Sequence, residues 1–178
     1  MRPIVMLEFA ARSTAEPWES RRITCDAGLG VAGAFSSATA RVMRPQRTFW
    51  EKATAVHAFC QQGEFRGGER FSRHWHDLIQ LDRAGIADAA IADRALALAV
   101  AKHKSRFFAE KTAAGELIDY VAAVSGGLRL VPSDTALGEL SLDYARMLDD
   151  GLLMGDAEPF ETLLERCRDL EARVNKVK

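Results

Sequence analysis

The chain has 178 residues, of which 48% are hydrophobic and 28% charged, and its formal net charge is −1. This composition suits a folded domain with a core, and the near balance of 24 basic and 25 acidic side chains argues against a protein that coats nucleic acid by bulk charge. No stretch approaches the roughly 20 apolar residues of a membrane span, and we expect neither a membrane segment nor a signal peptide.

The cysteines favour a reducing compartment. Cys25, Cys60 and Cys167 are odd in number and widely spaced, and none belongs to a Cys-x-x-Cys pair. This pattern indicates neither a zinc site nor a disulfide framework. We therefore expect the protein to be cytoplasmic.

Strand patterns lie in the N-terminal quarter. Residues 3–10 form a nearly continuous apolar run, typical of a strand buried on both faces, and include one acid, Glu8. Residues 21–26 and 39–43 predict two more strands. Residues 27–38, rich in glycine, alanine and serine, predict a loop or a short helix.

Helical spacing replaces the strand pattern from Thr48 onward. Thr48 and Glu51 match a capping box at a helix start, and Gly63 marks the end of that helix. A second helix is expected at residues 72–84, with Gly85 as its C-terminal signal. Further helices are expected at residues 88–108, 113–124, 134–148 and 160–178, with an extended piece at 128–131 after Gly126 and Gly127.

These elements predict an α+β protein that is mostly helical. A small N-terminal β element, residues 1–46, precedes a helical bundle, residues 47–178. The sequence shows no internal repeat and no low-complexity tract.

Two segments, RTFWEK and RHWHDL, place charged side chains beside a tryptophan at a predicted helix start. Glu51 and Lys52 fall in the first turn of their helix, where exposed N–H groups favour an anion, so Lys52 is a candidate phosphate ligand. Arg73 and Asp77 are four residues apart and share a helix face. Alternatively, Glu51 only caps its helix, and Arg73 and Asp77 form an intrahelical ion pair worth roughly a few tenths of a kcal/mol.

Glu8 is a third candidate. A carboxylate within a buried strand is unfavourable unless it meets a cation, a metal ion or strong donors, and strand-borne acids hold Mg²⁺ in many phosphoryl-transfer enzymes. The alternative is that Glu8 lies at the sheet edge and points into water. The histidines favour structural or surface roles over a metal site, because His74 and His76 point to different sides of a helix. The other two histidines are His57 and His103.

The order of four segments resembles the C-terminal half of the AbiEii/AbiGii toxin family. These segments are VMLEFAARS, RPQRTFWEKATAVHAF, RFSRHWHDLIQL and HKSRFF. The family consists of nucleotidyltransferases of the polymerase-β type that act as toxins in type IV toxin–antitoxin and abortive-infection systems. The resemblance runs from residue 3 to about residue 108, and more loosely over the tail.

The resemblance implies Mg²⁺-dependent transfer of a nucleotidyl group from an NTP to an acceptor such as the 3′ end of a tRNA, and a cognate antitoxin as partner. It implies that Glu8 supplies the third acid of the metal site and that Lys52 contacts the triphosphate. It also implies that Asp77 is the acid of the last motif, with Arg73 in the same turn. The catalytic candidates are then Asp77, Lys52 and Glu8, and the nucleotide-binding candidates Lys52, Arg73 and Glu51.

One part of the family pattern is missing. The family carries a Gly-Ser or Gly-Gly motif and an Asp-x-Asp pair on a strand, and this sequence has no such combination. We therefore expect a truncated protein that is inactive in nucleotidyl transfer by itself and holds Mg²⁺ and NTP weakly. The uncovered sheet edge would then favour a homo-oligomer. The alternative is a non-catalytic remnant that binds a partner protein or RNA.

Overall fold

A computed structural model describes residues 14, 16–25, 35–65, 69–153 and 157–176. The chain forms two compact units, Met1–Arg44 and Pro45–Lys178. The strand predicted at residues 3–10, together with Glu8, lies outside the described residues.

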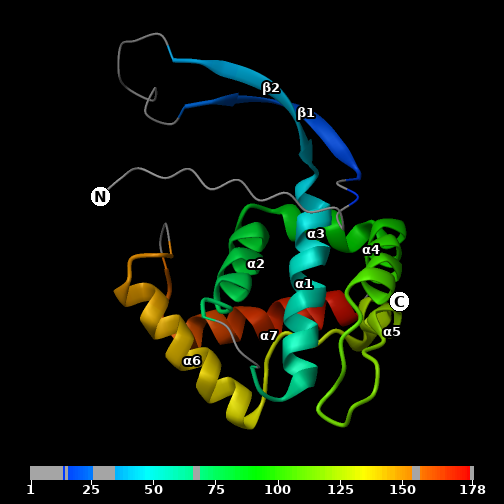
Figure 1. Ribbon diagram of the computed structural model, residues 1–178, viewed down its shortest axis with the longest axis vertical. Helices are drawn as coiled ribbons and strands as arrows, with labels where there is room; N and C mark the ends of the chain where they lie inside the picture. The colour runs from blue at the N-terminus through cyan, green and yellow to red at the C-terminus, as the bar shows by residue number, and fades with distance from the viewer. Residues whose placement is uncertain (1–13, 15, 26–34, 66–68, 154–156, 177–178) are drawn as a thin grey trace. The chain divides into compact units, whose positions relative to one another are not determined.

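The first unit contains two antiparallel strands, β1 (Trp18–Thr24) and β2 (Ser37–Met43) (Figure 1). Trp18 pairs with Met43 at one end of the ladder. The guanidinium carbon of Arg41 lies 4.5 Å from the centre of the Trp18 ring, a cation–π contact between the two strands. Both strands predicted in this part of the sequence are confirmed, although each begins at an earlier residue.

Helices build the second unit. They are α1 (Pro45–Gln62), α2 (Arg73–Arg83), α3 (Ile86–Ala92), α4 (Arg94–Phe107), α5 (Tyr120–Ala122), α6 (Asp134–Asp149) and α7 (Phe160–Lys176). Helix α1 packs against α2, α3 and α4, and α7 packs against α2 and α6 (Figure 1). The expected fold class, α+β and mostly helical, is confirmed. Among the described helices, none has both the length and the apolar character needed to cross a lipid bilayer.

Two buried tryptophans join α1 and α2 to the rest of the core. Trp50 and Trp75 are both 0% exposed. The indole N–H of Trp50 donates to the carbonyl of Ala90 at 2.9 Å, and that of Trp75 donates to the carbonyl of Leu130 at 2.7 Å. Because each buried indole has its N–H satisfied, these large side chains fill the core without leaving an unpaired donor.

Side chains hold the extended segment that follows α5. Asn175 accepts from the N–H of Leu128 and donates to its carbonyl, both at 2.9 Å, as a neighbouring strand would. Nδ1 of His57 accepts from the N–H of Arg129 at 3.0 Å. Burial, with the charge of Arg129 nearby, lowers the pKa of His57 to about 4. The ring is therefore neutral at neutral pH and keeps the lone pair that this hydrogen bond needs.

Two aspartates start helices where the apolar pattern did not predict a start. The helix predicted at residues 88–108 is broken at Asp93, whose carboxylate accepts the N–H three residues later at 2.9 Å. The helix predicted at 113–124 begins only at Tyr120, because Asp119 caps it in the same way. An aspartate at this position satisfies a free N–H of the first turn, which favours a new helix over a continuous one.

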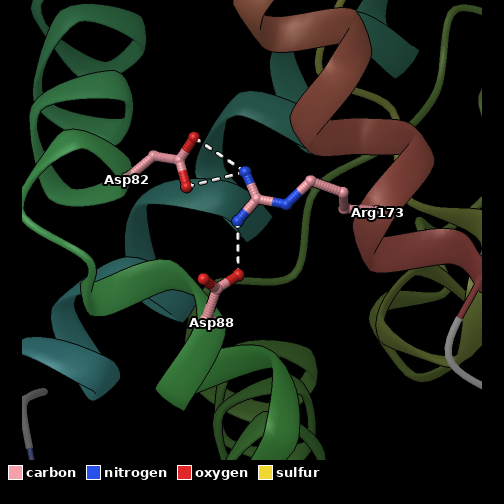
Figure 2. Close-up of polar contacts among 3 residues, drawn as sticks. All are labelled: Asp82, Asp88 and Arg173. Carbon is pink, nitrogen blue, oxygen red and sulfur yellow. Dashed lines mark hydrogen bonds and ion pairs between the residues drawn. The ribbon is translucent and has the colours of Figure 1, made fainter.

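An ion-pair network fixes α7 to α2 and α3. The guanidinium of Arg173 donates to both carboxylate oxygens of Asp82 at 2.9 Å and to Asp88 at 2.6 Å (Figure 2). The side chain of Asp88 is 79% exposed, so its contact with Arg173 is strongly screened by water. The network thus serves mainly to fix the register of three helices that pack around the core.

Candidate active site

The segments RTFWEK and RHWHDL meet in the structure. Lys52 of α1 and Asp77 of α2 form an ion pair, with Nζ donating to Oδ2 at 2.6 Å. The side chain of Lys52 is 24% exposed and that of Asp77 is 45% exposed. The partner that the structure gives Asp77 is therefore Lys52 and not Arg73. Because the pair lies at the surface, a ligand can reach both groups.

His74 holds the same lysine from a second side. Nζ of Lys52 lies 3.3 Å from Nδ1 of His74. An ammonium group can only donate, so Nδ1 is the acceptor and the ring proton is assigned to Nε2. Burial lowers the pKa of His74 to about 4, and the positive charges of Lys52 and Arg73 act in the same direction. At neutral pH the ring is uncharged and orients the ammonium group without repelling it.

The first turn of α1 differs from the prediction. The helix begins at Pro45, three residues before Thr48, because the fixed φ of proline suits the first helical position. Glu51 does not act as a cap, and its carboxylate accepts from Nε of Arg47 at 2.8 Å. Lys52 therefore lies beyond the first turn, away from the free N–H groups of the helix start. It can bind an anion only through its ammonium group.

A second lysine, Lys104 of α4, adds positive charge to this region. Burial lowers the pKa of Lys104, whereas the charges of Glu51 and Glu110 raise it. Its own charge contributes to lowering the pKa of His74. The segment HKSRFF, which contains Lys104, is part of the family resemblance, but the sequence pattern did not predict a role for this lysine.

A pocket of about 470 Å³ opens beside Asp77. Its polar lining comes from α2 and from Arg70, which lies three residues before the start of α2. Its apolar wall comes from the end of α6 and from two leucines that follow this helix. The lining residues are Arg70, Arg73, His76, Asp77, Gln80, Met147, Leu152 and Leu153. This volume and this mixture of apolar and convergent polar groups are typical of small-ligand sites. The arginines suit phosphate oxygens, and the apolar wall suits the face of a base.

A buried carboxylate on α6 shapes this pocket. Asp143, which is 6% exposed, accepts from the backbone N–H of Arg70 and from that of Ser72, both at 2.8 Å. Arg70 has φ of 69°, a left-handed conformation that is unfavourable for a residue with a side chain. Asp143 thus holds the loop that brings Arg70 and Arg73 to the pocket. Sequence reasoning missed Asp143, because its partners lie about 70 residues away along the chain.

The described residues do not by themselves fit a Mg²⁺ site. Mg²⁺ requires near-octahedral oxygen ligands, usually one or two carboxylates together with substrate phosphates. One oxygen of Asp77 is engaged by Lys52. Within the part of the chain that the structure describes, no group of three His, Cys, Asp or Glu side chains could hold a metal ion. The role of Glu8 as a metal ligand stays a prediction.

Comparison with known proteins places the chain in a family. Residues 1–166 match the family model described as nucleotidyl transferase AbiEii toxin, type IV TA system. No curated protein and no solved structure matches the chain. The family match spans RTFWEK and RHWHDL, the two segments whose charged side chains meet in the structure. The chain therefore belongs to the AbiEii family of nucleotidyl transferase toxins of type IV toxin–antitoxin systems.

Proposed function

We propose that this protein binds the triphosphate of an NTP at Lys52 and takes part in nucleotidyl transfer to an acceptor such as the 3′ end of a tRNA. The contact between Lys52 and Asp77, at the edge of a pocket lined by Arg73, is the observation that supports this proposal. Lys52 is held in place by two acceptors before any ligand arrives. A cation fixed in this way stabilises phosphate charge without the cost of reorganisation during the reaction.

Each candidate residue then has a distinct role. Lys52 contacts the triphosphate, and Arg73 faces the nucleotide in the pocket. Asp77 positions Lys52, and Glu51 acts at a distance through its ion pair with Arg47. Glu8 would supply a carboxylate ligand for Mg²⁺, and that ion would neutralise phosphate charge when bound.

We further propose that the chain needs additional carboxylates to complete the reaction. Its sequence contains no Asp-x-Asp pair, and two-metal phosphoryl transfer requires acids that hold both ions. These acids are proposed to come from outside the printed sequence, either from the same polypeptide or from another one. The protein alone is then expected to bind an NTP without transferring it. The type IV toxin–antitoxin assignment of the family supports a cognate antitoxin as a further partner.

Calorimetric titration of the purified protein with each of the four common NTPs, with and without Mg²⁺, tests this proposal. Lys52→Ala is expected to abolish the heat of binding, whereas the matched variant Lys176→Ala, at an exposed lysine of α7, is expected to bind as the wild type does. Incubation with labelled NTP and tRNA then measures transfer. Equal NTP affinity in the wild type and in Lys52→Ala would show that Lys52 does not bind the triphosphate.

A further inference from the structure

A second pocket, here called the α1-end pocket, lies where the C-terminal end of α1 meets the loop after α4. Its volume is about 490 Å³, and it shares no lining residue with the pocket beside Asp77. It is lined by Phe59, Gln62, Ala109, Glu110, Lys111 and Thr112. Because most of these side chains are polar, the pocket suits a ligand that offers hydrogen-bonding groups.

Backbone hydrogen bonds fix the loop that forms one wall of the α1-end pocket. The N–H of Thr112 donates to the carbonyl of Glu116 at 2.8 Å, which closes the loop on itself. The N–H of Ala113 donates to the carbonyl of Gln61 at 2.9 Å and ties the loop to the last turn of α1. This wall is therefore formed before a ligand arrives, which lowers the entropy lost on binding.

Two polar side chains of this pocket have hydrogen-bonding capacity that the fold does not use well. The hydroxyl oxygen of Thr112 is buried and has no hydrogen-bond partner among the described residues. A carboxylate oxygen of Glu110 accepts from Nε2 of Gln62 at 3.3 Å, a long bond that is exposed to solvent. A ligand that bonds to these groups would satisfy the hydroxyl and replace a weak contact of the carboxylate.

The α1-end pocket is a neighbour of the charged groups in the candidate active site. Phe59, which lines the pocket, stacks on His74 with ring centres 5.9 Å apart, and His74 contacts Lys52. Lys104 interacts electrostatically both with Glu110 of the pocket and with His74. Along α1, Phe59 follows Lys52 by two helical turns, a rise of roughly 10 Å. A ligand in this pocket would therefore lie near a triphosphate held by Lys52.

We propose that the α1-end pocket binds the 3′-terminal base of an RNA acceptor and selects a base that carries an amino group. Nucleotidyl transfer brings two nucleotides together, and the pocket beside Asp77 accounts for only one of them, the NTP. Unpaired bases at the end of a strand are read by hydrogen bonds along their Watson–Crick edges. The second pocket supplies such bonds next to the site of the first nucleotide.

The residue types of the pocket set its preference among bases. A carboxylate only accepts hydrogen bonds, so Glu110 matches the exocyclic amino group of cytosine, adenine or guanine. Uracil carries a carbonyl at the position of the amino group of cytosine, and two acceptors would then face each other. Thr112 and Gln62 each donate as well as accept, which suits the ring atoms beside the amino group. The role of this base as the acceptor rests on the proposed function, whereas the preference itself does not.

Fluorescence anisotropy of four RNA hexanucleotides, labelled at the 5′ end and identical except for the 3′-terminal base, tests this inference on the full chain. RNAs that end in C, A or G are expected to bind at least about fivefold tighter than the RNA that ends in U. Glu110→Gln is expected to bring the four affinities within about twofold of one another, because an amide donates as well as accepts. The matched control, Glu116→Gln, makes the same change in the same loop outside the pocket and is expected to keep the preference.

Thr112→Val removes the hydroxyl and keeps the branched shape of the side chain. It is expected to weaken binding of all four RNAs by about threefold or more, because one hydrogen bond to the ligand is lost. The temperature of thermal unfolding is not expected to fall, since the hydroxyl has no partner within the described part of the fold. A threonine with only a structural role would show the opposite pair of results.

Four results would overturn the inference. These are equal affinity of the wild type for the four RNAs, a preference that persists in Glu110→Gln, unchanged RNA affinity in Thr112→Val, and loss of NTP binding in Glu110→Gln, which would assign the pocket to the NTP. Lys52→Ala separates the two proposals, because it is expected to lose NTP binding and to keep the preference among RNAs. NTP binding that survives in Lys52→Ala would overturn the triphosphate site and leave the preference of the α1-end pocket standing.

Discussion

Acid is expected to destabilise the folded protein through His57, because this histidine is buried in the core. His57 is 4% exposed, and its Nδ1 accepts from the N–H of Arg129. Its pKa falls from 6.5 in an unfolded chain to about 4 in the fold, mainly because burial disfavours the charged ring. As the pH falls below 6.5, the unfolded chain binds a proton at His57 before the folded protein does. The contribution of His57 to stability is therefore complete above pH 6.5 and is lost as the pH falls towards 4.

The magnitude follows from these two pKa values. Linkage gives a loss of about 2 kcal/mol at about pH 5, rising to about 3 kcal/mol near pH 4. A loss of this size is a large fraction of the stability of a small domain, roughly 5–15 kcal/mol. Acid should therefore weaken the helical unit measurably before most of its carboxylates are protonated.

Urea denaturation, followed by far-UV circular dichroism at a series of pH values, measures this loss. His57→Gln provides the control, because a glutamine carbonyl can accept the same N–H and does not titrate. The pKa of His74 is also lowered to about 4, but both proteins contain His74, so its effect cancels in the difference. The unfolding free energy of the wild type minus that of the variant should fall by about 2 kcal/mol between about pH 7 and pH 5. A difference that does not change with pH would refute the reasoning.

Three further predictions concern other parts of the fold. Asp77→Asn is expected to lower the unfolding free energy by under about 1 kcal/mol, because its pair with Lys52 is partly exposed to solvent. A loss of several kcal/mol in urea denaturation would show that the pair is effectively buried. Asp143→Ala is expected to lower it by about 3 kcal/mol, because the N–H groups of Arg70 and Ser72 lose their acceptor; a change below about 1 kcal/mol would mean that the loop finds another partner. Self-association is expected because, among the described residues, β1 and β2 pair only with each other and leave sheet edges that can accept a further strand. A monodisperse monomer in light scattering would contradict this prediction.

The amino-acid sequence by itself determined that a short β element precedes a series of helices, and it located several of those helices. Apolar side chains at helical spacing fixed α2, α6 and α7, and the glycine at position 85, with φ of 71°, ends α2 as predicted. The charged segments RTFWEK and RHWHDL were also visible, since their residue types stand out without any knowledge of partners. Errors arose where a local helix-start residue competed with the apolar pattern, as at Pro45 and Asp93. There a proline or an aspartate settles the helix start within one turn.

Only the tertiary structure decided which charges meet. Lys52 and Asp77 are 25 residues apart, and their contact depends on how α1 packs against α2. The pocket beside them depends on Asp143, whose bond to Arg70 spans 73 residues. Side-chain spacing reports only neighbours within one helix, three or four positions away. The partner of a charge on another helix is set by packing of the apolar faces, and so the site appears only once the core has formed.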